Sequence, residues 1–208
     1  MLKKVLLLAA LALALPMAAF ASGNIEFQSS GGSLTGGASG LSLSGAVLTQ
    51  VNALYGGGLL QGSNLGSVSF TTGALISGSL SAGGTFAAGG TFVINGNGSN
   101  GVPNGVIFSG TFGGPVTWTA NTTGMQGVVS YTLSGALSGT LSNGYQTIGD
   151  IHTSTASFTF TGSHKGYFKG TIGSSDTTVV VPEPGTLSLF GTGLLGLAGL
   201  VRRKLNLV

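Results

Sequence analysis

The side chains of this chain that could act as acids, bases or metal ligands gather at only one place. Asp150 and His152 are two positions apart, so both would face the same side of a β-strand, and His164 could join them across a hairpin. Such a group predicts at most a minimal metal or acid–base site, the basis of a secreted hydrolase. The simpler interpretation is an ordinary polar strand end, because metal sites usually need three or four ligands. We therefore expect no catalytic residue, no metal and no cofactor.

Aromatic side chains are a second group of candidates, because their rings can stack on the apolar faces of sugars. Trp118 is the one tryptophan, and it lies between two threonines, so on a strand it faces away from both. The competing interpretation makes Trp118 the largest anchor of a core, which the usual burial of tryptophan favours. Extracellular polysaccharide is thus a candidate partner, with Trp118 as the candidate stacking residue and with further rings from Tyr131, Tyr145 and Tyr167.

The composition argues against several other kinds of chemistry. The chain has no cysteine and no Gly-x-Ser-x-Gly motif, and its glycine-rich stretches lack the lysine of a phosphate-binding loop. Only 5% of its residues are charged, against about 25% in an ordinary soluble domain. Residues 22–181 carry a net charge of −1, from Lys165 and Lys169 against Glu26, Asp150 and Asp176. The formal +3 of the chain therefore belongs to its ends, and we expect no nucleic-acid partner.

The amino-terminal segment has the pattern of a secretory signal peptide. Two lysines precede an unbroken apolar run over residues 5–15, which is shorter than the roughly 20 residues that span a bilayer. Ala19 and Ala21 then supply the small side chains that signal peptidase requires, so we place the cut after Ala21. The segment predicts export, with signal peptidase as the first partner.

The carboxyl-terminal segment has three parts in a fixed order. Residues 181–184, Val-Pro-Glu-Pro, form an extended link, because two prolines exclude a helix. Residues 186–201 are uncharged and would form a helix about 24 Å long at 1.5 Å per residue, somewhat short of the hydrocarbon core. The basic residues that follow would remain cytoplasmic while the body lies outside; they are Arg202, Arg203 and Lys204. The alternative to a processed tail is a permanent membrane anchor.

This terminal arrangement resembles the PEP-CTERM sorting signal, on the residues Val181, Pro182, Glu183 and Pro184, the apolar helix and the basic cluster. The resemblance implies recognition by exosortase, a membrane-embedded cysteine transpeptidase of Gram-negative bacteria that make extracellular polysaccharide. It further implies cleavage near the Pro-Glu-Pro triplet and delivery of the body to the cell surface or matrix. The short extension after Lys204 is a mild departure from the family pattern.

The body between these segments predicts strands. Gly, Ser and Thr make up 80 of its 160 residues, and glycine disfavours helix. Apolar and hydroxyl side chains alternate with period two in several stretches, as in residues 156–161, and Asn-Gly pairs mark tight turns between them. We expect one antiparallel sandwich or barrel of nine or ten short strands, with the last two over residues 167–172 and 177–181. Residues 29–66 show the least pattern, and we expect them to be loop-rich or loosely paired.

Together these patterns divide the chain into a signal peptide (1–21), an all-β extracellular domain (22–181) and a sorting signal (182–208). The expected function is structural or adhesive, because a surface with few charges has little electrostatic repulsion. The expected location is the inner membrane as a transient intermediate, and then the cell surface or extracellular matrix. A polysaccharide-binding module and a secreted hydrolase remain the alternatives.

Overall fold

The computed structural model describes residues 23–122, 127–161 and 166–181. Within these ranges, no helix is long and apolar enough to cross a membrane. The described residues from Asn24 to Val181 form one compact unit of β-strands with a short 3-10 turn. The all-β class that the sequence predicts is therefore confirmed.

The strands follow one another along the chain, and most of them are long. They are β1 (Asn24–Gly37), β2 (Gly40–Asn52), β3 (Leu60–Thr71), β4 (Leu75–Ser79), β5 (Gly83–Phe86), β6 (Gly89–Asn97), β7 (Asn104–Phe112), β8 (Val116–Thr122), β9 (Val128–Leu141), β10 (Gln146–Thr161) and β11 (Tyr167–Val180). The 3-10 turn η2 (Leu54–Gly56) lies between β2 and β3.

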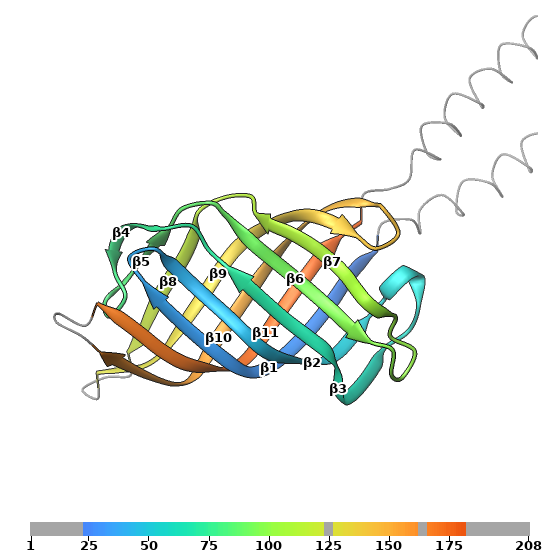
Figure 1. The fold of residues 1–208 in the computed structure, drawn as a ribbon, viewed down its shortest axis with the longest axis horizontal. Helices are drawn as coiled ribbons and strands as arrows, with labels where there is room; N and C mark the ends of the chain where they lie inside the picture. Colours follow the sequence, from blue (N-terminus) through green and yellow to red (C-terminus); the bar gives the residue numbers. More distant parts are fainter. Residues whose placement is uncertain (1–22, 123–126, 162–165, 182–208) are drawn as a thin grey trace, which may run out of the picture. The chain divides into compact units, whose positions relative to one another are not determined.

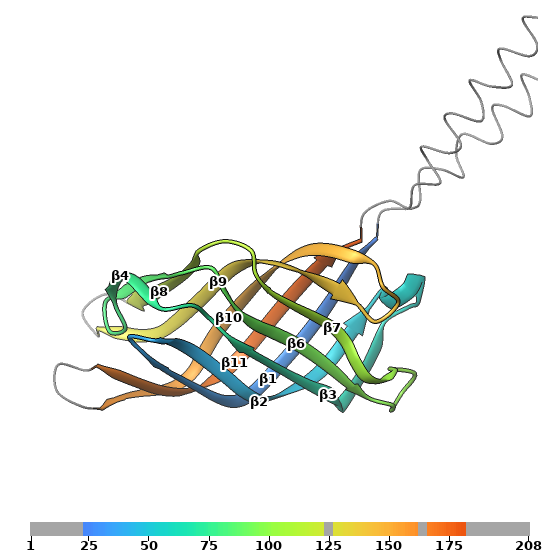
Figure 2. The ribbon, with the colours of Figure 1, turned by 45° about the horizontal axis from the view of Figure 1, so that its top comes forward.

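Antiparallel pairing closes these strands into a barrel (Figure 1). Eight strands complete the ring in the order β10, β11, β1, β2, β3, β6, β7, β9, and β9 returns to β10. β9 is shared, because its residues 128–134 pair with β8 while its residues 137–141 pair with β7. β5 and β4 add to β8, and β4 and β8 lie at the same end of the barrel in both views (Figure 2).

The first and last strands meet along almost their whole length. Asn24 is opposite Val180, and Gly36 is opposite Phe168 at the other end of the register. Asn24 and Val180 therefore lie side by side at one end of the barrel, which we call the terminal end. The opposite end carries the connection between β10 and β11, where Tyr167 pairs with Thr161.

The period-two pattern explains why these residues form the wall. In β8, Val116 and Trp118 are buried while the threonines beside Trp118 are exposed, so apolar side chains fill the interior and hydroxyls cover the outside. Phe70 and Phe92 stack at a ring-centroid distance of 6.1 Å, and Phe112 meets both rings edge-on. Burying one such side chain contributes about 1.5–3 kcal/mol, so the interior compensates for the absence of disulfides.

Inward-facing glycines make room for these rings. Gly110 and Gly139 lie opposite each other on β7 and β9, and the ring of Phe108 covers both. A Cβ atom added at Gly139 would lie 2.7 Å from the Phe108 ring and 2.4 Å from the Ser109 carbonyl oxygen. Packing thus requires part of the high glycine content, because glycines alternate with large side chains on the inner face.

The structure corrects three expectations about the body. Its described residues form eleven strands, six of them with at least 12 residues, and not nine or ten short strands. Residues 29–66 form most of β1, all of β2 and the start of β3, so they are not loosely paired. Their inward positions carry isolated leucines such as Leu34, Leu41 and Leu43, each fully buried, and this sparse pattern concealed the strands. The last two expected strands are one strand, β11, which continues through an irregular pairing between Ile172 and Ser174.

Adding a side chain at Gly139 tests the packing of the barrel wall. We expect Gly139→Val to lower the free energy of unfolding by at least about 2 kcal/mol, because the backbone and the Phe108 ring leave no space for it. Gly114→Val is the matched control, since a Cβ atom there meets no atom within 4 Å. Urea denaturation of both variants measures the difference, and equal stabilities would contradict this packing.

Candidate functional site

Of the predicted processing residues, one lies in the part of the chain that the structure describes. Of the sorting motif, Val181 is described: it follows β11 directly and packs, partly buried, against the core. The other candidate processing residues lie outside the described residues; these are Ala19, Ala21, Pro182, Glu183, Pro184, Arg202, Arg203 and Lys204. The last residue that the structure describes, Val181, thus directly precedes the Pro-Glu-Pro triplet.

Closure of the barrel determines where the two predicted processing segments are attached. Asn24 and Val180 are paired residues on neighbouring strands. The segment that precedes β1 and the segment that follows β11 therefore leave from the same end of the wall. The sequence gives no local sign of this arrangement, because it results from pairing between the first and the last strand.

Trp118 is a core residue, and its burial removes the basis of the sugar-stacking prediction at this position. Its side chain is 1% exposed. One face stacks on Tyr131 at a ring-centroid distance of 4.8 Å, and Phe168 packs edge-on at 5.0 Å. The indole Nε1 donates a hydrogen bond to the Leu80 carbonyl oxygen at 2.8 Å. Its polar atom is therefore satisfied inside the barrel, as a buried tryptophan requires.

The three candidate tyrosines do not form a common surface with Trp118. Tyr131 is 1% exposed, and its hydroxyl donates a hydrogen bond to the Ser81 carbonyl oxygen at 2.7 Å. Burial raises the pKa of Tyr131 above its ordinary value of 10.0. Tyr145 and Tyr167 are exposed, but they flank opposite ends of β10, roughly 50 Å apart at 3.3 Å per residue.

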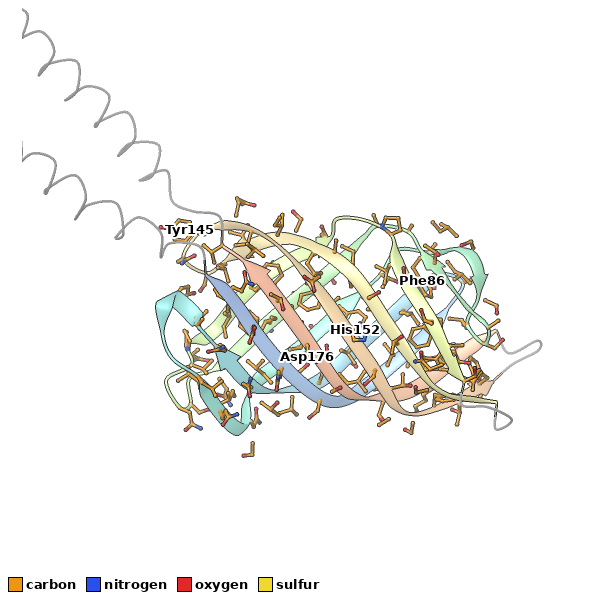
Figure 3. All side chains as sticks on the ribbon, turned by 180° about the vertical axis from the view of Figure 1, so that it is seen from behind. Phe86, Tyr145, His152 and Asp176 are labelled. Atoms are coloured by element: carbon orange, nitrogen blue, oxygen red, sulfur yellow. The ribbon has the colours of Figure 1, made fainter. Side chains whose placement is uncertain are left out.

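Asp150 and His152 do face the same side, as the i, i+2 spacing predicts, and both are exposed on the outer wall. Across the sheet, His152 is opposite Asp176 and Asp150 is opposite Thr178 (Figure 3). His164 lies outside the described residues. Among the residues that the structure does describe, no three His, Cys, Asp or Glu side chains are placed to hold a metal ion.

Asp176 is the neighbour of His152 that the sequence analysis missed. His152 lies nine residues before the end of β10, and Asp176 lies nine residues after the start of β11. Counting outward from the connection between the two strands would have paired them. The missing information was the continuity of β11, which we expected to be two strands.

A shallow groove on the outer wall contains Lys169. It has a volume of about 230 Å³ and is lined by parts of β1, β10 and β11, namely Ser33, Ser157, Phe158, Thr159, Lys169, Gly170 and Thr171. The hydroxyls of Ser157 and Thr171 hydrogen-bond to each other at 2.8 Å. Lys169 is seven residues along β11 from Asp176, roughly 20 Å at strand spacing. Lys165, its expected companion, lies outside the described residues.

The fold and the position of the motif define a class of protein, an all-β barrel with a sorting segment directly after its last strand. A family model described as the PEP-CTERM protein-sorting motif matches residues 180–204. The chain therefore carries this motif, and the resemblance stated from the sequence is confirmed. Comparison with curated proteins and with solved structures gives no match for the chain.

The raised pKa of Tyr131 predicts a loss of stability at alkaline pH. Because the folded-state pKa lies above the unfolded value, this stabilisation is complete below pH 10 and is lost as the pH rises through the folded pKa. We expect the free energy of unfolding to fall more steeply above pH 10 in the natural chain than in Tyr131→Phe. At neutral pH we expect the free energy of unfolding of Tyr131→Phe to be about 1 kcal/mol lower, because the variant lacks the hydrogen bond to Ser81.

Urea denaturation followed by far-ultraviolet circular dichroism, at neutral pH and at pH values above 10, measures this difference. Tyr145→Phe is the control, since Tyr145 is exposed. In this variant the free energy of unfolding should fall with pH above pH 10 as steeply as in the natural chain. An identical slope in Tyr131→Phe and the natural chain would show that the buried phenol does not control the alkaline transition.

Proposed function

We propose that this protein is a structural or adhesive component of the cell surface or extracellular matrix. It is delivered there as the barrel alone, after both terminal segments have been removed. The PEP-CTERM motif at residues 180–204 carries the proposal, because it implies export and processing by exosortase-type machinery. The finer steps are part of the proposal: signal peptidase cuts after Ala21, the apolar segment holds an inner-membrane intermediate, and the transpeptidase then cuts near Pro182, Glu183 and Pro184.

The surface of the barrel supports a structural role. Hydroxyls pair across neighbouring strands on the outer wall, as in Thr71 with Thr91 at 3.0 Å and Ser154 with Ser174 at 3.1 Å. Such side chains offer both hydrogen-bond donors and acceptors without charge, so hydrated polymers and other copies meet little repulsion. The interior is occupied by the protein's own side chains. A rigid, charge-poor body of this kind suits a matrix component.

A non-enzymatic role is part of the same proposal. Catalysis needs an acid, base or nucleophile within hydrogen-bond reach of a partner and of a bound substrate. Asp150 and His152 lie on the convex outer wall and are both exposed, so the wall gives them no enclosed cavity that would exclude water from a substrate. We infer that they belong to the hydrated surface.

Polysaccharide binding is the second candidate, and the groove at Lys169 is the observation that favours it. Its hydroxyls match the polar groups of sugars, and Lys169 would attract a carboxylate-bearing sugar unit. Trp118 no longer contributes, since it is buried. Retardation of the chain by an acidic polysaccharide in a native gel, lost in Lys169→Gln, would support this candidate.

Mapping the mature termini in a host with the sorting system tests the main proposal. We expect the stable protein to begin at Ser22 and to lack Arg202 and everything after it. Replacing Pro182 and Pro184 by alanine should leave the uncut precursor in the membrane fraction, because the extended link that the enzyme requires is lost.

Pro103→Ala is the matched control, because Pro103 is an exposed proline in the connection between β6 and β7. This variant should be processed like the natural chain. Stable protein that retains both Met1 and Val208 would contradict the proposed function.

A further inference from the structure

Exposed apolar side chains are unevenly distributed over the barrel. Among the described residues, seven large apolar or aromatic side chains are exposed. Two of them, Ile76 and Tyr167, lie toward the end opposite the termini. The other five form what we call the terminal rim, and they are Tyr55 (47% exposed), Leu59 (53%), Val106 (49%), Tyr145 (46%) and Ile148 (64%).

Hydrogen bonds join the parts of the terminal rim around the connection between β9 and β10. The hydroxyl of Tyr55 hydrogen-bonds to that of Ser142, so the β2–β3 connection reaches the β9–β10 connection. The backbone N–H of Ser142 donates to the carbonyl oxygen of Ile107 at 2.8 Å, which places Val106 beside the same turn. Tyr145 ends this turn, and its carbonyl oxygen accepts a hydrogen bond from Leu141 at 3.0 Å.

Tyr55 is held outward by an unusual backbone. Ala53 and Tyr55 adopt left-handed conformations, with φ of 58° and 51°, which non-glycine residues adopt rarely and at a cost in free energy. Between them, Leu54 is buried at 7% exposure. The turn η2 is therefore anchored in the core by Leu54 while it presents Tyr55 to the outside.

The terminal rim lies where the chain leaves the barrel. Ile148 is opposite Val180, which is in turn opposite Asn24, and Tyr145 lies at this end (Figure 3). From Val181, the four residues 182–185 precede the uncharged run 186–201. The five Cα–Cα steps from Val181 to Thr186 span at most about 18 Å when fully extended. A bilayer that holds the apolar run is therefore within that distance of the last residue of the barrel.

We propose that the terminal rim is a lipid-contacting surface, on which the barrel rests against the bilayer while the uncharged run 186–201 is inserted. This inference rests on the proposed membrane intermediate. Tyrosines flanked by aliphatic side chains are the combination that enters the interface between headgroups and acyl chains, because the ring is apolar and the hydroxyl remains hydrated. The contact orients the barrel on the membrane and keeps residues 182–184 near the interface for the transpeptidase.

The charges on the wall predict which lipid the terminal rim prefers. Asp150 lies on the same outer face as Ile148, two residues further from the rim, and Glu26 is opposite Thr178 on the neighbouring strand. These carboxylates repel anionic headgroups at distances within a Debye length. The contact is therefore expected with zwitterionic phosphatidylcholine and is weakened by added anionic lipid at low salt.

Fluorescent labels at single cysteines in the full chain test this orientation, since the natural chain has no cysteine. Gly58→Cys places a label beside the terminal rim, where a side chain meets no atom within 4 Å. Ser39→Cys, at the exposed tip between β1 and β2 at the other end, is the matched control. Leu195→Cys, within the uncharged run, reports whether this run is inserted. The chain is reconstituted in phosphatidylcholine vesicles that contain a lipid with a spin-label quencher.

We expect quenching of the Leu195 label and at least about twofold stronger quenching at Gly58 than at Ser39. Replacing Tyr55 and Tyr145 by serine should bring the Gly58 label down to the Ser39 value, whereas Tyr167→Ser should not. Equal quenching at Gly58 and Ser39 with Leu195 quenched would overturn the rim contact and leave the anchored intermediate standing. An unquenched Leu195 label would contradict the anchored intermediate itself, and the rim contact with it.

Discussion

The pairing of β1 with β11 is the interaction on which the rest of this structure depends. It converts an open sheet into a closed ring, so that the backbone donors and acceptors of the first and last strands find partners and no strand of the ring is left as an edge. Closure matters more than usual here, because the chain has no disulfides and very few charges. The wall of hydrogen bonds and the aromatic interior supply the stability.

Closure also connects the fold to the proposed function. It brings Asn24 and Val180 together, so that the predicted signal peptide and the segment that carries the PEP-CTERM motif are attached at one end of the barrel. Removal of both segments would leave the barrel complete, since β1 begins at Asn24 and β11 ends at Val180. The PEP-CTERM motif begins at Val180, the last residue of β11, so the proposed cleavage near residues 182–184 would leave every strand intact. The exposed apolar side chains of the terminal rim lie at the same end.

The sequence predicted those features that depend on local pattern. The alternation around Trp118 correctly placed its ring on the opposite side to its threonine neighbours, and the spacing of Asp150 and His152 correctly placed both on one face. Features that depend on distant pairing were not predicted. Isolated leucines such as Leu34 and Leu41 concealed β1 and β2, because glycine and serine fill the positions between them. The terminal rim also depends on distant pairing, because Tyr55 and Tyr145 come to the same end only in the closed barrel. The sequence therefore did not predict it.

A disulfide trap between the first and last strands tests the central claim most directly. Gln28 and Asp176 are opposite each other and both exposed, so in the full chain Gln28→Cys with Asp176→Cys should form an intrachain disulfide under mild oxidation. Gln28→Cys with Lys169→Cys should not, because that offset of seven residues exceeds the reach of a disulfide. Mass spectrometry of the oxidised variants distinguishes the outcomes. A Gln28–Asp176 pair that stays reduced, or that links only between chains, would contradict closure of the barrel by β1 and β11.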